Sequence, residues 1–159
     1  MIYSSVNAPK RYRMFAITLA ATVFYSAALP TLAQALGSAD LNIEASGFND
    51  ESGHAIAKLF FPGQNVRQRG HLEIKADIQG GKASLAFLAL PPGDYAVVVF
   101  HDANDNGIID HNLIGIPNEE LGFSNAFKLS LSSGLPTFNK LKFAHGESAQ
   151  TIAIRVEAL

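Results

Sequence analysis

Four stretches of the chain alternate between hydrophobic and polar residues. In the first of them, Leu41, Ile43 and Ala45 are separated by Asn42 and Glu44. A period of two places the apolar side chains on one face and the polar ones on the other, which predicts a β-strand with one buried face. The four stretches are 40–45, 71–78, 140–143 and 151–157.

Three further runs are apolar at almost every position. They cover residues 54–61, 83–90 and 95–100, and this pattern predicts strands in the interior of a sheet, covered on both faces. The first run is also compatible with a short helix. Turn residues, mainly Gly, Pro, Asn and Asp, separate the runs. About seven short strands predict an all-β fold, an antiparallel β-sandwich of immunoglobulin-like or transthyretin-like type.

The first 35 residues have a different pattern. Three basic residues precede an apolar run at 14–29, and the small residues Ala33-Gln-Ala35 follow it. This order is typical of a secretory signal peptide cleaved after Ala35. The alternative is an uncleaved membrane anchor, but the run is close to the lower limit of about 17 residues for a spanning helix. We therefore predict a signal peptide at 1–35 and a single β-sandwich domain at 36–159, located in the periplasm or outside the cell.

Composition and charge narrow the classes of function. All 14 Asp and Glu residues follow the predicted signal peptide, so the exported domain is acidic, which disfavours nucleic-acid binding. The chain has no cysteine, and this excludes disulfides, thiolate metal sites and a lipid-anchored lipoprotein. With 48% apolar and 16% charged residues, we expect a folded domain.

The segment directly after the third apolar run has the spacing of a calcium loop. With Asp102 as position one, Asn104 and Asn106 supply side-chain oxygens at positions three and five, and Asp110 does so at position nine. A glycine at position six permits the sharp turn, and the carbonyl of Ile108 at position seven can face the same point. Hard oxygen donors of this kind favour calcium.

Position twelve departs from the EF-hand pattern. It is Leu113 where an EF-hand has a bidentate Glu, and the flanking segments are predicted as strand and loop. The missing carboxylate could come from Glu119 or Glu120. Calcium would then be structural and would order the long stretch from Asp102 to Ser124. The alternative is an empty loop in which Asn and Asp side chains accept hydrogen bonds from nearby backbone N–H groups.

Two other kinds of site deserve comparison with the calcium loop. His101 and His111 flank the same segment and could join Asp102 and Asp110 in a transition-metal site. Ser124 could join His101 and Asp102 in a hydrolase, although the chain has no G-x-S-x-G elbow and neighbouring residues of a strand point to opposite faces. His54, His71 and His145 lie beside turns and have no evident partners in the sequence.

Ordered motifs indicate a family resemblance. Leu-Pro-Pro-Gly-Asp-Tyr-Ala-Val at 90–97 resembles a hairpin of prealbumin-like and collagen-adhesin B-type modules. Together with His-Asp-x-Asn-x-Asn-Gly-x-x-Asp at 101–110, Gly-Ile-Pro-x-Glu at 115–119 and Gly-Phe-Ser-Asn at 122–125, it resembles the bacterial exported proteins grouped as domain of unknown function 2141. The resemblance implies an exported β domain of unassigned role, and it favours Glu119 over its neighbour as the ligand.

These patterns together predict an exported, non-enzymatic protein. We expect a monomeric accessory or interaction module of the cell envelope, with a structural calcium ion, no integral membrane span after cleavage, no nucleic-acid partner, and an unknown envelope or extracellular protein as a possible partner. One alternative is a carrier of a small apolar ligand or a partner protein. Another is a periplasmic hydrolase or metal-dependent enzyme.

Overall fold

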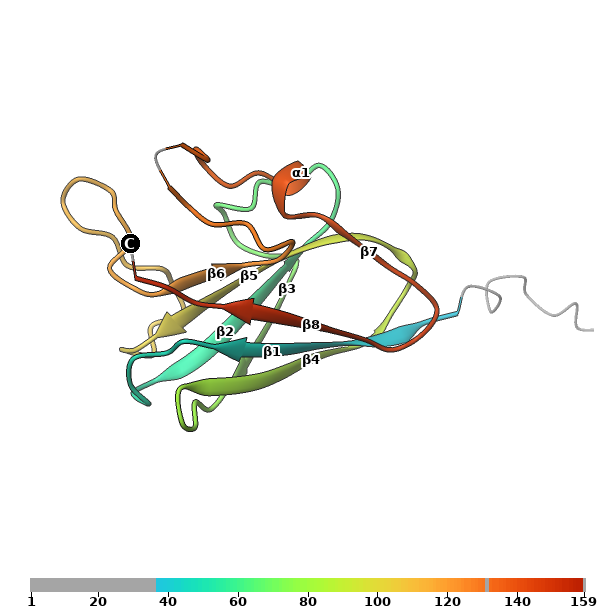
Figure 1. Ribbon diagram of the computed structural model, residues 1–159, viewed down its shortest axis with the longest axis horizontal. Coiled ribbons are helices and arrows are strands. Elements are labelled where there is room, and N and C mark those ends of the chain that lie inside the picture. Colours follow the sequence, from blue (N-terminus) through green and yellow to red (C-terminus); the bar gives the residue numbers. More distant parts are fainter. Residues whose placement is uncertain (1–36, 131, 159) are drawn as a thin grey trace, which may run out of the picture. The chain divides into compact units, whose positions relative to one another are not determined.

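Two sheets pack face to face and confirm the predicted all-β sandwich (Figure 1). The structure is a computed structural model, and it describes residues 37–130 and 132–158. The predicted signal peptide and its cleavage site lie outside these residues. The first sheet has the order β4-β1-β8 and the second has the order β3-β2-β5-β6, with β7 on β5. The strands are β1 (Ala39–Ser46), β2 (His54–Phe60), β3 (Leu72–Ala76), β4 (Lys82–Leu90), β5 (Gly93–Asp102), β6 (Leu121–Phe123), β7 (Phe143–His145) and β8 (Gln150–Arg155).

The strand order of this sandwich differs from that of an immunoglobulin constant domain. Strand β1 lies between β4, with which it is antiparallel, and β8, with which it is parallel. In an immunoglobulin constant domain the first strand belongs to a four-stranded sheet and pairs with the second. Here the first and second strands lie in different sheets.

Strands β2 and β5 are buried on both faces, as their apolar runs predict. Leu59, Val97 and Val99 point between the two sheets and are fully buried. Phe60 and Phe100 point to the other face of the five-stranded sheet and are also fully buried. Loops cover this outer face, so the sheet separates two apolar clusters. The covering loops therefore determine where a functional site on this face can lie.

Strand β4 does not lie in the interior of a sheet as its run of apolar residues predicts. It is an edge strand, and its exposed positions alternate with buried ones. Small residues such as Ala86 occupy the outer positions, and Leu88 is 71% exposed. Because alanine contributes little apolar area, an alanine-rich outer face reads as apolar in the sequence and still tolerates water.

The predicted strand over 140–143 is wrong in its first half. Phe138–Leu141 forms the one-turn helix α1, in which the N–H groups of Lys140 and Leu141 donate to the carbonyl of Thr137. The buried Leu141 side chain packs into the outer cluster, so a tertiary contact selects the helical turn. The short strand β6 was not predicted, because three residues are too few to show a period.

Strand β6 joins the two sheets at one edge. Leu121 and Glu157 exchange two backbone hydrogen bonds of 3.0 Å each, which link the end of the three-stranded sheet to β6. Gly122 makes this approach possible, since a Cβ there would lie 2.6 Å from Ile154 Cγ2 and 2.7 Å from the carbonyl oxygen of Arg155. Among the described residues, no helix is long and apolar enough to cross a membrane.

Candidate functional site

The candidate calcium loop begins where the central strand β5 ends. Asp102, the last residue of β5, is 1% exposed and pairs with His54 on β2. The preceding turn packs directly against it, because a Cβ on Gly53 would lie only 1.9 Å from the Asp102 carbonyl oxygen. Gly53 has a φ of +58°, a conformation that favours glycine. A rigid sheet and a close turn therefore fix the start of the loop.

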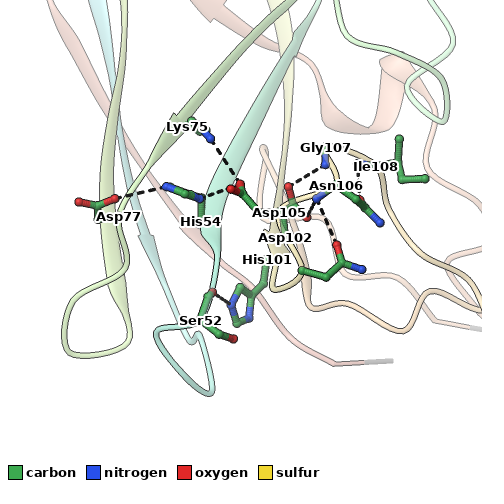
Figure 2. Close-up of polar contacts among 11 residues, drawn as sticks. Ser52, His54, Lys75, Asp77, His101, Asp102, Asp105, Asn106, Gly107 and Ile108 are labelled. Atoms are coloured by element: carbon green, nitrogen blue, oxygen red, sulfur yellow. Dashed lines mark hydrogen bonds and ion pairs between the residues drawn. The ribbon is translucent and has the colours of Figure 1, made fainter.

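The Asp102 carboxylate organises the first turn of the loop (Figure 2). Its two oxygens accept hydrogen bonds from the N–H groups of Asn106, at 3.0 Å, and Gly107, at 2.8 Å. Gly107 has a φ of +77°, so the glycine at position six makes the sharp turn that the spacing predicts. The loop curls around the side chain of its own first residue.

Asp110 collects the two asparagines of the motif. The amide nitrogens of Asn104 and Asn106 donate to Asp110 Oδ2 at 2.7 and 3.0 Å. The amide oxygens of the same asparagines accept from the N–H groups of Asn106 and Ile108, at 3.2 and 2.9 Å. The Ile108 side chain itself is 59% exposed. The structure thus brings the predicted positions into one hydrogen-bonded network, of the kind that the empty-loop alternative describes.

Glu119 and Glu120 lie in the segment before β6 and make different contacts. Glu119 Oε2 accepts the N–H of Asp110 at 3.2 Å, which places it at the loop. Burial raises the pKa of the Glu119 carboxyl, and the negative charges of Asp102 and Asp110 raise it further, against the lowering effect of the Asp110 N–H. Among the described residues, these three carboxylates have no ion-pair partner. The negative charges of Asp102 and Asp110 therefore act on Glu119 without a cationic side chain of the described residues paired to any of the three.

Glu120 instead binds His101, behind the loop. Its Oε2 lies 2.9 Å from His101 Nδ1, and the carbonyl oxygen of Ser52 lies 2.7 Å from His101 Nε2. Burial alone would lower the pKa of His101, but Ser52, Glu120 and the charge of Asp50 outweigh burial and raise it. Both ring nitrogens face acceptors, so the imidazolium form suits this place. The histidine is a buried link between the 47–53 turn and the start of β6.

The structure does not bring all predicted ligands to one point. Within residues 37–130 and 132–158, no three His, Asp or Glu side chains converge at metal-ligand geometry. His111 is exposed and forms a backbone bridge with Pro117, while His101 is turned to Glu120. The two histidines of the transition-metal alternative therefore serve separate contacts.

An ion-pair cluster beside the loop was missed in the sequence (Figure 2). Asp105 Oδ1 lies 2.8 Å from His54 Nδ1 and 3.3 Å from Lys75 Nζ, and His54 Nε2 lies 3.5 Å from Asp77. His54 has no evident partner in the sequence, but in the structure it contacts both Asp105 and Asp77. Its partners follow from the pairing of β2 with β3 and β5, which the sequence alone does not specify. Asp105 thus points away from the calcium motif.

Ser124 is occupied by the backbone of two neighbouring elements. Its hydroxyl accepts the N–H of Val97 at 2.9 Å and donates to the carbonyl of Leu141 at 2.7 Å. The residue is 2% exposed and makes no hydrogen bond to His101 in the described part of the chain. This contact ties β5 to α1, a role in packing.

The fold and the loop define a two-sheet β module with an Asp- and Asn-rich loop between its central strand and an edge strand. The chain belongs to the family described as an uncharacterized protein conserved in bacteria, DUF2141, whose model matches residues 43–153. The match includes the whole candidate loop and confirms the resemblance inferred from the ordered motifs. The chain has no match among curated proteins or among solved structures.

Proposed function

We propose that the protein is an exported, non-enzymatic module of the bacterial envelope whose loop 102–120 is ordered by a calcium ion. One observation carries the calcium proposal. The carboxylates of Asp102, Asp110 and Glu119 all lie at the 102–120 loop, and among the described residues none of them is paired with a cation. Burial is the main cause of the raised pKa of Glu119, and the negative charges of Asp102 and Asp110 raise it further. A bound divalent cation would neutralise this charge.

The donor set fits calcium better than a transition metal. Asp102, Asp110 and Glu119 would supply carboxylate oxygens, Asn104 and Asn106 amide oxygens, and Ile108 its carbonyl. Six oxygen donors match the coordination number and the ligand hardness that calcium requires. The ion would supply positive charge and order to the loop, and no chemical step is assigned to it.

Occupied side chains support a non-enzymatic role. Both ring nitrogens of His101 bind Glu120 and Ser52, and both hydrogen-bonding functions of Ser124 bind the backbone. A nucleophile and its base need contact with each other, and the described contacts of these residues serve the packing instead. Activity toward a panel of esters, amides and glycans that is lost in Ser124→Ala would overturn this part of the proposal.

Export is proposed from the leader. N-terminal sequencing of the protein recovered from the periplasm or the medium of an expressing bacterium should begin at Leu36. An intact leader on membrane-bound protein would contradict the proposed export.

Melting temperature tests the calcium proposal. Protein purified from a host that expresses the full chain should melt at a higher temperature in millimolar calcium than in chelator. At a calcium concentration about 100 times Kd, linkage gives about 2.7 kcal/mol of stabilisation. Asp110→Asn should lose the response.

The matched control for this measurement lies in the same loop. Asp105→Asn removes a carboxylate that points to His54 and Lys75, and asparagine tolerates the positive φ of 59° at this position. This variant should keep the calcium response of the unmodified protein. Equal melting temperatures of the unmodified protein in calcium and in chelator would contradict the calcium proposal.

A further inference from the structure

Four neighbouring residues form a row across the outer face of the five-stranded sheet. Glu73 on β3 pairs with Lys58 on β2, Lys58 pairs with Val98 on β5, and Val98 pairs with Phe123 on β6. Because paired residues share a face of a sheet, the row runs from a charged end to an apolar end. The outer face therefore changes in polarity from β3 to β6.

A cavity of about 800 Å³ lies over this row. Its size is within the range of about 300–1,000 Å³ that is usual for small-molecule sites. Three segments form its walls: 66–69 after β2, 106–117 of the candidate calcium loop, and the residues Leu129, Leu135 and Pro136 before α1. At the apolar end the lining includes Leu129, Leu135 and Pro136. The cavity thus has an apolar body on a partly charged floor.

Lys58 is the unusual residue in this cavity. The residue is only 7% exposed, yet its Nζ makes no hydrogen bond within the part of the chain that the structure describes. Nζ forms a long ion pair with Glu73 Oε1, which is 3.9 Å away and beyond hydrogen-bond distance, and it lies 4.7 Å from the centre of the Phe100 ring. No fully enclosed polar side-chain atom of the described residues lacks a partner, so Nζ is accessible from the cavity that Lys58 lines.

Lys140 differs from Lys58, because its side-chain nitrogen is hydrogen-bonded although the residue is exposed. Nζ of Lys140, which is exposed, donates to the carbonyl oxygens of Ser133 and Leu135 at 2.6 and 2.9 Å. Buried polar groups are nearly always hydrogen-bonded, and burying an ammonium group without a good partner costs free energy. The donors of Lys58 are thus free for an acceptor inside the cavity.

The charged residues of the lining indicate which kind of acceptor fits the cavity. The lining carries Lys58, Arg67 and Arg69 against a single carboxylate, that of Glu73, so the charged end has an excess of positive charge. We infer that the cavity binds a small amphipathic carboxylate. Its carboxylate accepts hydrogen bonds from Lys58, and its apolar tail lies over Val98 and Phe123. The anchor of this site lies on β2, while the candidate calcium loop forms one of its walls, so binding is measured both with and without calcium.

Calorimetric titration with three ten-carbon probes tests the inference. Protein purified from a host that expresses the full chain is titrated with decanoate, decanol and decylammonium, in calcium and again in chelator. Decanoate should bind most tightly, and Lys58→Met should weaken it by about 10–100-fold, the range for losing a hydrogen bond to a charged group. Lys58→Arg keeps the charge and should retain the preference for decanoate.

A matched control uses the same substitution elsewhere. Lys142→Met removes an exposed lysine that pairs with Asp94 on the surface and should leave decanoate binding unchanged. Equal affinity for decanoate and decanol, absence of binding by decanoate, or an unchanged affinity in a folded Lys58→Met protein would each overturn the inference. If Lys58→Met does not fold, amide NMR of the unmodified protein decides, because decanoate must shift the Lys58, Val98 and Phe123 signals more than decanol does. Decanoate binding in chelator separates this site from the calcium loop, whichever way the calcium experiment falls.

Discussion

Nδ1 of His101 lies 2.9 Å from Oε2 of Glu120, and both residues are buried. The other ring nitrogen faces the carbonyl oxygen of Ser52. The pair thus fastens the turn before β2 and the segment before β6 to the end of β5. These segments flank the candidate calcium loop, so the pair holds the base of the loop in place.

The His101–Glu120 pair predicts a stability that decreases with rising pH. The folded protein raises the pKa of His101, so it binds the proton more tightly than the unfolded chain does. The stabilisation is complete below the usual histidine pKa of about 6.5 and is lost as the pH rises through the raised folded value. Urea unfolding between pH 6 and pH 9 should measure a falling free energy of unfolding.

Two variants test whether this pair causes the decrease. Glu120→Gln should flatten the pH dependence, because the neutral amide favours the imidazolium less. His111→Gln, at an exposed loop position, should leave it as it is. A free energy of unfolding that stays constant across this range in the unmodified protein would contradict the role of the pair.

Glu119 should have opposite effects on stability and on calcium binding. Its raised pKa means that the ionised carboxylate is disfavoured in the folded protein. Glu119→Gln removes the charge that burial and the neighbouring carboxylates of Asp102 and Asp110 disfavour, and it keeps an oxygen for the Asp110 N–H. In chelator at neutral pH it should raise the free energy of unfolding by a few tenths to about 1 kcal/mol, and it should weaken calcium binding. Denaturant unfolding and calcium titration of this one variant check the two effects. A variant that is less stable than the unmodified protein in chelator would contradict an unfavourable charge at Glu119.

Gly122 should not tolerate even a methyl group. A Cβ at this position would meet Ile154 Cγ2 and the Arg155 backbone, and overpacking of this kind costs about 1–3 kcal/mol. Gly122→Ala should therefore lower the melting temperature. Gly146→Ala, where a Cβ meets nothing within 4 Å, should change stability by no more than about 0.5 kcal/mol. Equal effects of the two substitutions would refute the close contact between β6 and β8.

Ser124→Ala should act on stability. The change leaves the Val97 N–H and the Leu141 carbonyl without their partner in a buried place, at a cost of about 1–3 kcal/mol. Ser84→Ala removes an exposed hydroxyl that donates to Glu44 and should be close to neutral. Thermal unfolding of both variants makes the comparison, and a neutral Ser124→Ala would show that the bridge between β5 and α1 contributes nothing.

Much of the sandwich could be predicted because its strands carry their own period. Strand β1 alternates without exception, and β2 and β5 are apolar on both faces because loops cover the outer one. The Asp-Asn-Asn spacing likewise predicted that Asp102, Asn106 and Asp110 would meet, since a tight loop brings alternate residues together. The hydrogen bonds of these side chains agree with that expectation, whereas binding of an ion stays a prediction.

The remaining features depend on long-range pairing. Lys58 is one charged residue in an apolar run, and only the register of β2 with β3 and β5 places it between Glu73 and Val98. The contact of His101 with Glu120 requires β6 to lie beside β5, and β6 is too short to be recognised. Local patterns specify elements, but they do not specify which elements become neighbours.

Amide NMR during a calcium titration tests the central claim most directly. One equivalent of calcium should shift the backbone signals of residues 102–120 and leave those of β1 and β8 in place. Asp105→Asn should reproduce the shifts and Asp110→Asn should abolish them. Signals of the loop that stay unchanged at millimolar calcium in the unmodified protein would contradict the claim that calcium orders this loop.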